Sequence, residues 1–455
     1  MSRKNFSLSG MPDFSSSEVK KREYVFSKMQ IIFEKYGFSP LETPAIEKRE
    51  TLIGNYGFEG DKLVYQLLKS GNFLSQVDEK KILSKDVNFI APLVSDKALR
   101  YDLTIPFARY ISSNQANITL PFKRYQIQKV WRADRPQKGR LREFTQCDID
   151  VIGSQSIWLE SDLIKICDEV FTSLNLKNVV LKLNNRKILE GLYNYLTPKF
   201  SFIEFCISLD KIEKSGIDVF LSFLEKNMVS KKSISIFKSL FSKSISSKDF
   251  KSQFSSLFNF KSQLIEEGKN EVYNLLAKIS RLKNLTIEID FSLARGLDYY
   301  TGMIFEIKSN DINIGSIGGG GRYDKLTTLF GNNVGSGVGL SFGVERILIC
   351  LNELNLFPND LDFSLDVLFV NLGEREAILS QSYIDMLRNR GIKCELYPDN
   401  VKLKKQMSYA NKKKIDFVAL IGEDELKTNK ITLKNMINGS QEIISIENLI
   451  KKIKK

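Results

Sequence analysis

The chain has 455 residues, which is too long for one ordinary hydrophobic core and predicts two or three domains. Hydrophobic residues make up 42% and charged residues 27% of it, as in globular proteins, which argues against global disorder. No apolar stretch has the length that a membrane-crossing helix needs. The five cysteines form no CxxC pair, so neither a disulfide framework nor a zinc site is indicated. A reducing cytoplasm is the compartment that we expect.

Histidine is absent from the sequence. This excludes Ser-His-Asp and Cys-His nucleophile systems, as well as every histidine-ligated metal site. An enzyme with this composition must work with Arg, Asp, Glu, Gln, Tyr and bound ions. Because arginine stays protonated at neutral pH, arginines in its site would act as electrostatic clamps for anions.

The chain is basic, with 67 Lys and Arg against 54 Asp and Glu and a net charge of +13. The excess is uneven, since residues 226–263 contain eight lysines and one acid, Asp249, for a net charge of +7. Such a stretch is either a solvated helical face or a surface for the phosphate backbone of a nucleic acid. Composition leaves both interpretations open.

The first part of the chain is predicted to combine helices with one pair of long strands. The first helix covers residues 15–38, where Ser15 can cap its start and Gly37 ends it. The further predictions are strands of alternating polarity over 122–153 around a charged loop at 136–139, a helix over 154–174, helices over 186–286, strands at 284–291 and 299–308, and a helix from about 340 to 353.

After a predicted linker at 352–362, the pattern alternates between short apolar strands and helices. The strands are predicted at 365–370, 392–396, 417–421 and 431–434. This order predicts a small α/β domain with a mostly parallel sheet.

The segment 143–151 carries an unusual set of polar side chains for a strand. Alternation puts on one face Thr145, Cys147, Ile149 and Val151, which suit a helix layer. It puts on the other face Phe144, Gln146, Asp148 and Asp150. That face is either the wet side of an edge strand or the floor of a ligand site, with a ring for stacking and carboxylates for hydrogen bonds.

The hairpin turn before this strand contains four arginines and a lysine between residues 132 and 142. Like charges at this density repel unless anions lie among them, and phosphates are the natural candidates. Further along, the glycine run 318–321 allows backbone to approach a ligand closely, although a flexible loop is the commoner cause of such a run.

Together, these and other blocks resemble the class II aminoacyl-tRNA synthetases, and among them the histidyl-tRNA synthetases. The blocks that resemble motifs 1, 2 and 3 of the class are residues 36–44, 122–153 and 339–346. Residues 295–302 are similar to the block peculiar to histidyl-tRNA synthetases, and residues 99–104 to their first histidine-binding motif. The resemblance runs from about residue 12 to the end of the chain and is weakest over 186–286.

The resemblance implies a fold and a domain order. Residues 1–355 would form an α+β catalytic domain, built on an antiparallel sheet flanked by helices and interrupted by a helical insertion at 186–286. The linker at 352–362 would lead to an α/β anticodon-binding domain at 363–455. Motif 1 builds the subunit interface in this class, so the resemblance also implies a homodimer.

The implied activity is the ligation of histidine to tRNA-His. ATP and L-histidine would give histidyl-adenylate and pyrophosphate, and histidine would then pass to the 3′ end of the tRNA. Magnesium would be carried by ATP, so the protein itself would provide no metal site. No protein base is needed in the first step, because the histidine carboxylate is already an anion at neutral pH.

The resemblance assigns roles to the ATP-binding residues. Arg132 matches the motif 2 arginine on the α-phosphate, and Asp134 stands where a glutamate usually reaches the adenine amino group. Phe144 and Arg346 match the groups on the two faces of the adenine. Arg295 matches the arginine that clamps the α-phosphate beside the amino-acid carboxylate.

The resemblance also assigns histidine and tRNA contacts. The implied histidine site consists of Asp102, Thr104, Gln146, Asp150, Arg295, Tyr299 and Tyr300. Among these, Asp150 and Tyr300 match the groups that read the two imidazole nitrogens, one of which donates and one of which accepts. Arg135 and Gln137 match positions in the motif 2 loop that contact the tRNA acceptor end.

Two other functions are compatible with a class II scaffold. One is the histidyl-synthetase-like regulatory subunit of ATP phosphoribosyltransferase, which charges no tRNA. Such subunits generally lack the anticodon module and have a degraded catalytic set, whereas both are matched here. The other is a protein that only binds RNA. Its substrate-facing residues would be free to change in sequence, whereas here they match those of the enzymes.

Overall fold

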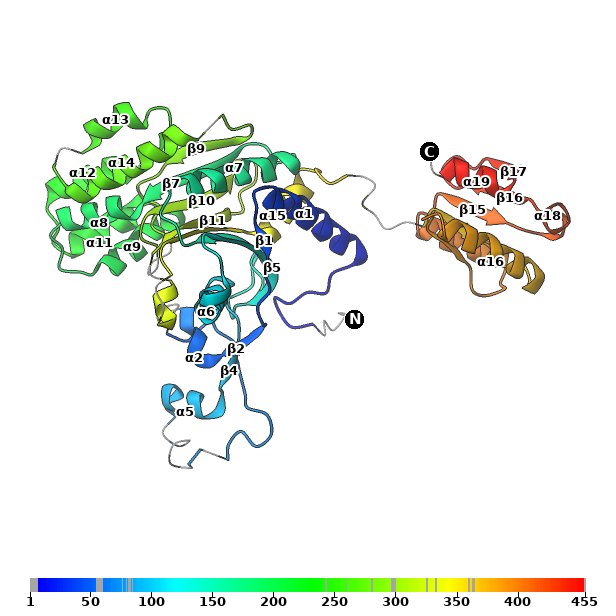
Figure 1. Cartoon of the computed structure of the whole chain (residues 1–455), viewed down its shortest axis with the longest axis horizontal. Coiled ribbons are helices and arrows are strands. Elements are labelled where there is room, and N and C mark those ends of the chain that lie inside the picture. Colours follow the sequence, from blue (N-terminus) through cyan, green and yellow to red (C-terminus); the bar gives the residue numbers. More distant parts are fainter. Residues whose placement is uncertain are drawn as a thin grey trace. The chain divides into compact units, whose positions relative to one another are not determined.

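The computed structural model describes residues 7–453 with the exceptions of 55–59, 76, 79, 81, 82, 84, 242, 243, 259, 280, 296–299, 325, 332, 333, 359, 360 and 362–364. The chain divides into two compact units, Met1–Phe357 and Pro358–Lys455, and each is described by itself (Figure 1). Among the described residues, no helix is long and apolar enough to cross a membrane.

A nine-stranded sheet with the order β1-β5-β6-β12-β11-β10-β7-β9-β8 forms the centre of the first unit. Its strands are β1 (Ser39–Pro40), β5 (Phe122–Trp131), β6 (Glu143–Ile152), β7 (Val179–Asn185), β8 (Ile245–Ser246), β9 (Leu285–Ile289), β10 (Met303–Ser309), β11 (Ser316–Tyr323) and β12 (Gly337–Phe342). The pairs β1–β5 and β7–β9 are parallel and the other described pairs are antiparallel. The expected antiparallel sheet flanked by helices is therefore confirmed.

The remaining elements of this unit surround the sheet. A small sheet of order β2-β4-β3 contains β2 (Ile46–Lys48), β3 (Gln66–Leu67) and β4 (Lys97–Leu99). The helices are α1 (Ser16–Lys35), α2 (Arg49–Leu52), α5 (Val87–Val94), α6 (Thr104–Ser113), α7 (Trp158–Ser173), α8 (Arg186–Tyr195), α9 (Phe202–Asp210), α10 (Ile212–Ser215), α11 (Ile217–Lys226), α12 (Lys231–Phe241), α13 (Phe250–Leu257), α14 (Gln263–Lys278) and α15 (Val344–Glu353). Short 3-10 turns lie at Gln115–Asn117 and Thr327–Phe330.

Helix α1 begins and ends as its sequence predicts. Ser15 and Glu18 form a capping box at its start, and Gly37 adopts a φ of +78° just after its end, a conformation that glycine adopts without strain. Its buried face meets strand β6, where the Cys147 sulfur lies 3.6 Å from the Met29 sulfur. Helices α1 and α7 thus cover one face of the sheet.

The alternation predicted for strand β6 is confirmed. Cys147, Ile149 and Val151 are buried in the main hydrophobic core on the side of α1 and α7. The opposite face, with Asp148 and Asp150, lines a large cavity instead of forming a wet edge, because β6 lies inside the sheet between β5 and β12.

One alternative near motif 3 is excluded and one local prediction there is wrong. The glycine run 318–321 is part of strand β11, paired on both sides, and does not form the flexible loop that was the alternative to close approach. The helix predicted from about residue 340 begins at Val344, since residues 337–342 pair with both β6 and β11. In both places, long-range strand pairing overrides the local sequence preference.

Residues 186–286 contain helices α8–α14 and strand β8 in the described part of the chain. Their core is rich in phenylalanine, including Phe205, Phe220 and Phe237, and it is continuous with the core beneath the sheet. Strand β8 pairs with β9, so this region also extends the sheet at one edge.

The second unit has a five-stranded sheet of order β14-β13-β15-β16-β17. Its elements are β13 (Val367–Phe369), α16 (Glu374–Arg388), β14 (Cys394–Leu396), α17 (Leu403–Lys412), β15 (Phe417–Leu420), α18 (Glu423–Thr428), β16 (Ile431–Asn435), β17 (Gln441–Ile444) and α19 (Ile446–Ile453). Only β14-β13-β15 is parallel, so the predicted mostly parallel sheet is wrong in its second half. The unpredicted β17 is an exposed edge strand without the alternation that marks a half-buried one.

Candidate active site

A cavity of about 750 Å³ lies on the sheet face opposite α1 and α7. Its walls contain most of the residues predicted from the sequence, namely Asp102, Thr104, Arg132, Asp134, Gln137, Phe144, Gln146, Asp150, Arg295, Tyr300 and Arg346. Arg135 is exposed on the hairpin and does not line the cavity. Tyr299, which we also predicted, lies outside the described residues.

Arg132 follows the end of β5 and is held between two aromatic rings. Its guanidinium carbon lies 4.3 Å from the Tyr101 ring centre and 5.1 Å from that of Phe144. Its Nε donates to the Tyr101 carbonyl at 3.0 Å, and its Nη2 donates to Gln146 Oε1 at 3.3 Å. These contacts fix the plane of the guanidinium at the cavity wall.

The charges of the hairpin are partly balanced by acids of the protein itself. Arg140 donates twice to the Asp134 carboxylate, from Nε and Nη2 at 2.9 Å each. Lys138 pairs with Glu353 at 2.5 Å. The Asp134 carboxylate is thus engaged by a neighbouring arginine of the same hairpin.

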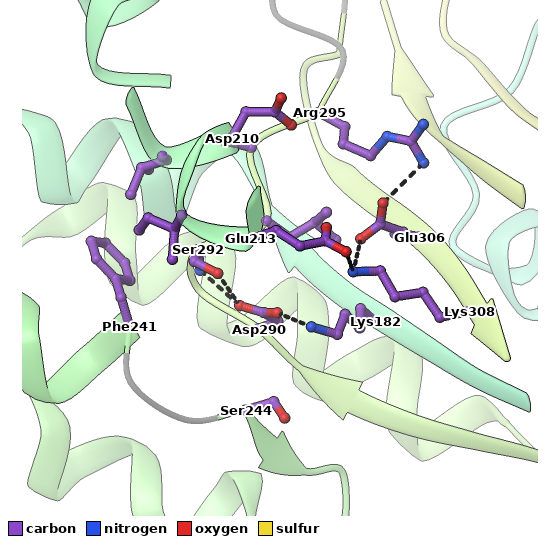
Figure 2. A pocket seen from close by; sticks show the side chains of 14 residues that line it. Lys182, Asp210, Glu213, Phe241, Ser244, Asp290, Ser292, Arg295, Glu306 and Lys308 are labelled. Carbon is purple, nitrogen blue, oxygen red and sulfur yellow. Dashed lines mark hydrogen bonds and ion pairs between the residues drawn. The ribbon is translucent and has the colours of Figure 1, made fainter. Parts of the chain in front are cut away.

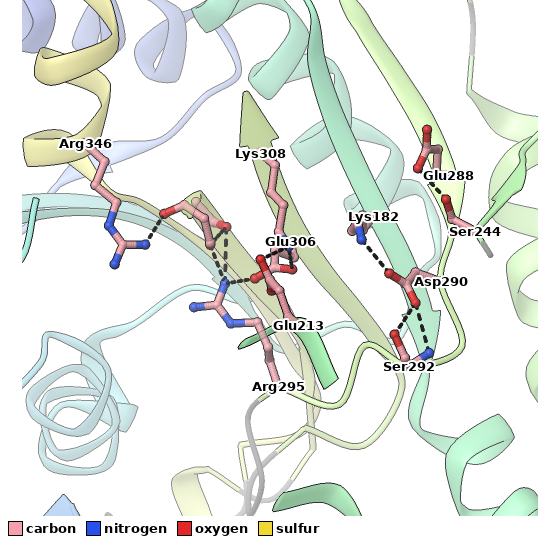
Figure 3. Close-up of polar contacts among 12 residues, drawn as sticks. Lys182, Glu213, Ser244, Glu288, Asp290, Ser292, Arg295, Glu306, Lys308 and Arg346 are labelled. Carbon is pink, nitrogen blue, oxygen red and sulfur yellow. Dashed lines mark hydrogen bonds and ion pairs between the residues drawn. The ribbon is translucent and has the colours of Figure 1, made fainter. Parts of the chain in front are cut away.

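Arg295 and Arg346 both contact Ser316, and Figure 3 shows the two arginines reaching toward one another from different elements. Arg295 Nη1 donates to Ser316 Oγ at 2.7 Å, and Arg346 Nη1 donates to the Ser316 carbonyl at 2.7 Å. Burial lowers the pKa of Arg346, and the positive charges of Arg295 and Arg140 lower it further. Two cations that repel one another across one residue form a site that an anion would stabilise.

The glycine run of β11 makes room for these arginines. A Cβ atom on Gly319 would lie 2.5 Å from Arg295 Nη1, and one on Gly321 would lie 2.9 Å from the Tyr300 ring. The run is therefore needed for close approach, as the sequence suggested, but here the approaching groups are side chains and backbone of the protein.

Part of the cavity wall consists of the buried carboxylates Asp148 and Asp150. Asp150 accepts a hydrogen bond from the Tyr323 hydroxyl at 2.7 Å and forms an ion pair with Arg124 Nη2 at 2.7 Å. Arg124 is fully buried and lies 4.4 Å from the centre of the Phe107 ring. Burial raises the pKa of Asp150, and Arg124 opposes that shift.

Gln146 links Arg132 to Asp148. Its Oε1 accepts from Arg132, and its Nε2 donates to the Asp148 carboxylate at 3.2 Å and to Ser341 Oγ at 3.3 Å. Asp102 caps helix α6, since its Oδ1 accepts from the Ile105 N–H at 3.2 Å. The cavity wall therefore combines arginines with buried carboxylates.

Several residues of this site carry no role in the sequence prediction. They are Tyr101, Arg124, Arg140, Asp148, Glu306, Ser316, Tyr323 and Ser341. Arg124 could have been found, because the predicted hairpin places it directly opposite Asp150 in register. Asp148 was placed on the correct face by alternation. Tyr323 and Ser316 have no local signal, because they come from strands that are distant in sequence.

Residues 96–347 match the protein-family model described as histidyl-tRNA synthetase, and residues 366–455 match the one described as anticodon binding domain. The chain belongs to the histidyl-tRNA synthetase family. A histidine–tRNA ligase of Bacteroides fragilis is 44% identical over 442 residues, with 97% of each chain covered. The crystal structure of the histidyl-tRNA synthetase from a Nostoc species has a TM-score of 0.77 at 28% identity and covers 99% of each chain.

A second solved structure bears on the regulatory-subunit alternative. It is described as an ATP phosphoribosyltransferase regulatory subunit/histidyl-tRNA synthetase from Bacillus halodurans, and it has a TM-score of 0.69 at 17% identity. It covers 89% of this chain and 96% of its own, and at this identity it shows the fold alone. The histidine–tRNA ligase relative spans both domains of the chain at much higher identity, so the regulatory alternative is not favoured.

Membership of the histidyl-tRNA synthetase family accounts for both kinds of group in the cavity wall. The family uses ATP and binds histidine and tRNA. Arginines suit the phosphates of ATP, because a guanidinium forks onto two oxygens. Carboxylates suit the N–H groups of histidine, which need hydrogen-bond acceptors.

Asp148 gives a prediction on pH and stability. Burial is the main cause that raises its pKa from an ordinary 3.8 to about 7; Asp150 adds to the shift and Arg124 opposes it. Because the folded-state pKa is the higher one, the stability that protonated Asp148 contributes at low pH is lost as the pH rises from about 4 to about 7. Asp148→Asn should therefore raise the free energy of unfolding at pH 8 by on the order of 1–3 kcal/mol.

Urea unfolding of the wild type and of Asp148→Asn at pH 4 and pH 8 measures this difference. At pH 4 the two proteins should be nearly equal in stability, since Asp148 is then protonated in the folded state. An equal difference at both pH values would contradict the raised pKa.

Proposed function

We propose that this chain activates L-histidine with ATP and transfers the histidine to the 3′ end of tRNA-His. The observation that supports this most is the composition of the cavity wall. It combines the cations Arg132, Arg295 and Arg346 with the buried carboxylates Asp148 and Asp150. An adenylate-forming enzyme for a nitrogen-rich amino acid needs both kinds of group within one cavity.

The first step joins the histidine carboxylate to the α-phosphorus of ATP. A carboxylate oxygen forms the new bond to phosphorus, and the bond to the bridging oxygen breaks, so that pyrophosphate leaves with the electron pair. Arg132 and Arg295 stabilise the charge on the α-phosphate oxygens, and Phe144 and Arg346 hold the adenine. No side chain has to accept a proton in this step.

Magnesium would neutralise further charge on the β- and γ-phosphates when it is bound. The described residues contain no group of three or more Cys, Asp or Glu side chains placed to hold a metal ion. We therefore assign Mg²⁺ to the phosphates of ATP, with no cage of protein ligands of its own.

Histidine would lie between the arginines and the buried carboxylates. Asp102, Thr104 and Gln146 are assigned to its α-amino and carboxylate groups, next to Arg295. Asp150 and Tyr300 are assigned to the two imidazole nitrogens. Arg124 and Tyr323 hold the Asp150 carboxylate in place at 2.7 Å each, so that its orientation does not depend on the substrate.

The histidine dependence of ATP–pyrophosphate exchange tests this function. Exchange should require histidine and should not occur with any other standard amino acid, because only the imidazole places a nitrogen donor and a nitrogen acceptor on opposite edges of one small ring, where Asp150 and Tyr300 are assigned. Exchange that ignores histidine, or no exchange by a folded protein, would contradict the proposal. A folded protein without exchange would favour the alternative function, a regulatory subunit that charges no tRNA.

tRNA-His is the proposed macromolecular partner. Arg135 and Gln137 are exposed on the β5–β6 hairpin, outside the ion pairs that engage its other charges, and we assign them to the acceptor end. The second unit, which matches the anticodon binding domain, is assigned to the anticodon. The free, buried state of all five cysteines supports a reducing cytoplasm as the compartment.

The lysine-rich stretch 226–263 gives a prediction about tRNA binding. Lys231, Lys232 and Lys238 are exposed on α12, while Phe237 on the same helix is buried. If they contact phosphates, replacing all three with Ser should weaken tRNA binding and flatten its log–log salt dependence by about 0.7–0.9 per lost contact. Filter binding over a range of salt concentrations measures both effects.

Histidine activation by the triple variant is the internal control and should be unchanged, because these lysines lie outside the cavity. Unchanged tRNA affinity and salt slope would show that the stretch is only a solvated helical face.

We also propose that the protein is a homodimer. Residues 36–44 match motif 1, and within them β1 pairs in parallel with β5 at the edge of the large sheet. Nearby α1 exposes Ile31 at 65%. Sedimentation equilibrium should give twice the mass of the chain, and a stable, active monomer would contradict this.

A further inference from the structure

A second cavity, of about 300 Å³, lies beside the active-site cavity and is lined largely by ion pairs (Figure 2). One wall comes from the helical region 186–286, with Asp210 and Glu213 on α9 and α10. The other wall comes from strands β7 and β10 and from residues 290–295. Arg295 and Glu306 line both cavities, so this wall is shared with the active site.

Three ion pairs form a continuous chain across this wall. Arg295 Nη1 lies 3.2 Å from Glu306 Oε1, and the other oxygen of Glu306, Oε2, lies 3.2 Å from Lys308 Nζ. Lys308 Nζ in turn lies 2.5 Å from Glu213 Oε1. Figure 3 shows the resulting chain Glu213–Lys308–Glu306–Arg295 as alternating charges.

The backbone explains why these side chains meet. Glu306 and Lys308 are two residues apart on β10, so both point to the same face of the sheet. Glu213 is the one member from the helical region, on the short helix α10, which packs against α9 and α11. The chain therefore joins α10 to a residue of the active site.

Arg295 is anchored through a single nitrogen. Its contacts with described residues, to Ser316 Oγ at 2.7 Å, to the Gly318 carbonyl at 3.4 Å and to Glu306, all involve Nη1. Glu306 is the charged partner among them and is only 8% exposed. Glu306 therefore influences where the Arg295 guanidinium lies and how much of its positive charge is neutralised. This influence depends on whether the Glu306 oxygens contact Arg295 or Lys308.

We propose that Lys308 and Glu213 are positioning residues for Arg295, and that they couple helix α10 to the activation of histidine. This inference rests on the proposed function, in which Arg295 stabilises the α-phosphate. Lys308 holds Glu306 Oε2, which leaves Oε1 as a single contact for Arg295. Without Lys308, the Glu306 carboxylate is free to pair with Arg295 through both oxygens. The positive charge of Arg295 is then neutralised more by Glu306 and stabilises the α-phosphate less.

The same cavity provides a matched control. Lys182 forms an ion pair with Asp290 at 2.6 Å and lines this cavity, but it does not line the active-site cavity. Asp290 also accepts hydrogen bonds from the Ser292 backbone and hydroxyl. Lys182 feels the negative charges of Glu306 and Glu213, but its ion pair is with Asp290. Lys182→Met therefore removes a similar charge from the same wall and leaves the three ion pairs of the chain in place.

The test compares kcat and KM for ATP in histidine-dependent pyrophosphate exchange. Lys308→Met should lower kcat about ten-fold with KM for ATP changed less than about two-fold, since the loss concerns charge that develops in the transition state. Lys308→Arg should restore kcat to within about two-fold of the wild type, because it keeps the charge beside Glu306. Lys182→Met should stay within about two-fold of the wild type in both constants.

Glu213→Gln tests the connection to α10 and avoids the core, because Glu213 is 55% exposed. It should lower kcat about three-fold alone and cause no further loss in the Lys308→Met background, since its effect passes through Lys308. A kcat of Lys308→Met equal to that of Lys182→Met, or additive effects of Glu213→Gln and Lys308→Met, would overturn the inference. Wild-type exchange without histidine dependence would instead overturn the proposed function, and the inference with it.

Discussion

Arg295→Ala should lower the rate of histidine-dependent pyrophosphate exchange about 10²–10³-fold. Removing one preorganised charged contact to the α-phosphate raises the barrier by roughly 3–4 kcal/mol. The fold should persist, because the Arg295 side chain is 39% exposed and belongs to none of the hydrophobic clusters among the described residues. Steady-state exchange kinetics, with circular dichroism to verify folding, measures the effect.

Arg281→Ala is a suitable control for this variant, because Arg281 is an exposed arginine that does not line the active-site cavity. It should exchange pyrophosphate at the wild-type rate. Near-normal exchange by a folded Arg295→Ala protein would contradict the assignment of Arg295 to the α-phosphate. It would also contradict the proposed coupling of α10 to activation, which depends on that assignment.

Gly320→Ala should destabilise the first unit by roughly 3 kcal/mol or prevent its folding. A Cβ atom at this position would lie 2.1 Å from the Gly339 carbonyl oxygen and 2.8 Å from the Leu340 Cα. Both are backbone atoms of the paired strand β12, so they cannot move aside without breaking the β11–β12 pairing. Urea unfolding monitored by far-UV circular dichroism measures the loss.

Gly318→Ala, in the same run, is the matched control. Its Cβ atom would meet the end of the flexible Ile307 side chain at 3.0 Å and the Ser341 carbonyl oxygen of β12 at 3.2 Å, which is 1.1 Å farther than the backbone contact at Gly320. The cost should be about 1 kcal/mol or less, provided that Ile307 repacks. Equal losses in the two variants would show that the run is needed for general strand flexibility and not for close packing against β12.

The same glycines show where sequence reasoning reaches its limit. A run of four glycines predicts that backbone approaches a ligand closely, whereas the close neighbour of Gly319 in this structure is the Arg295 side chain. The sequence does not reveal that the approaching atoms include the backbone of residues 339 and 340, because that contact depends on strand order. The misplaced start of α15 has the same cause, since residues 337–342 become a strand only by pairing on both sides.

Strand β6 is the opposite case. Its alternation is local and strict, so the sequence alone predicts which face enters the core and that Asp148 and Asp150 share the other face. That this other face lines a cavity and is not a wet edge depends on the position of β6 between β5 and β12. Glu306 and Lys308 also share a face of one strand, but their importance depends on Arg295 and Glu213, which reach them from distant parts of the chain.

The charging of tRNA-His with labelled histidine tests the central claim most directly. The account predicts that the wild-type protein, with ATP and Mg²⁺, transfers histidine to a tRNA-His transcript and leaves a tRNA of another amino acid uncharged. Arg295→Ala should fail in this assay, because no adenylate forms. Pyrophosphate exchange with histidine but no charged tRNA-His, or equal charging of both tRNAs, would contradict the assignment of this chain as a ligase specific for histidine and its tRNA.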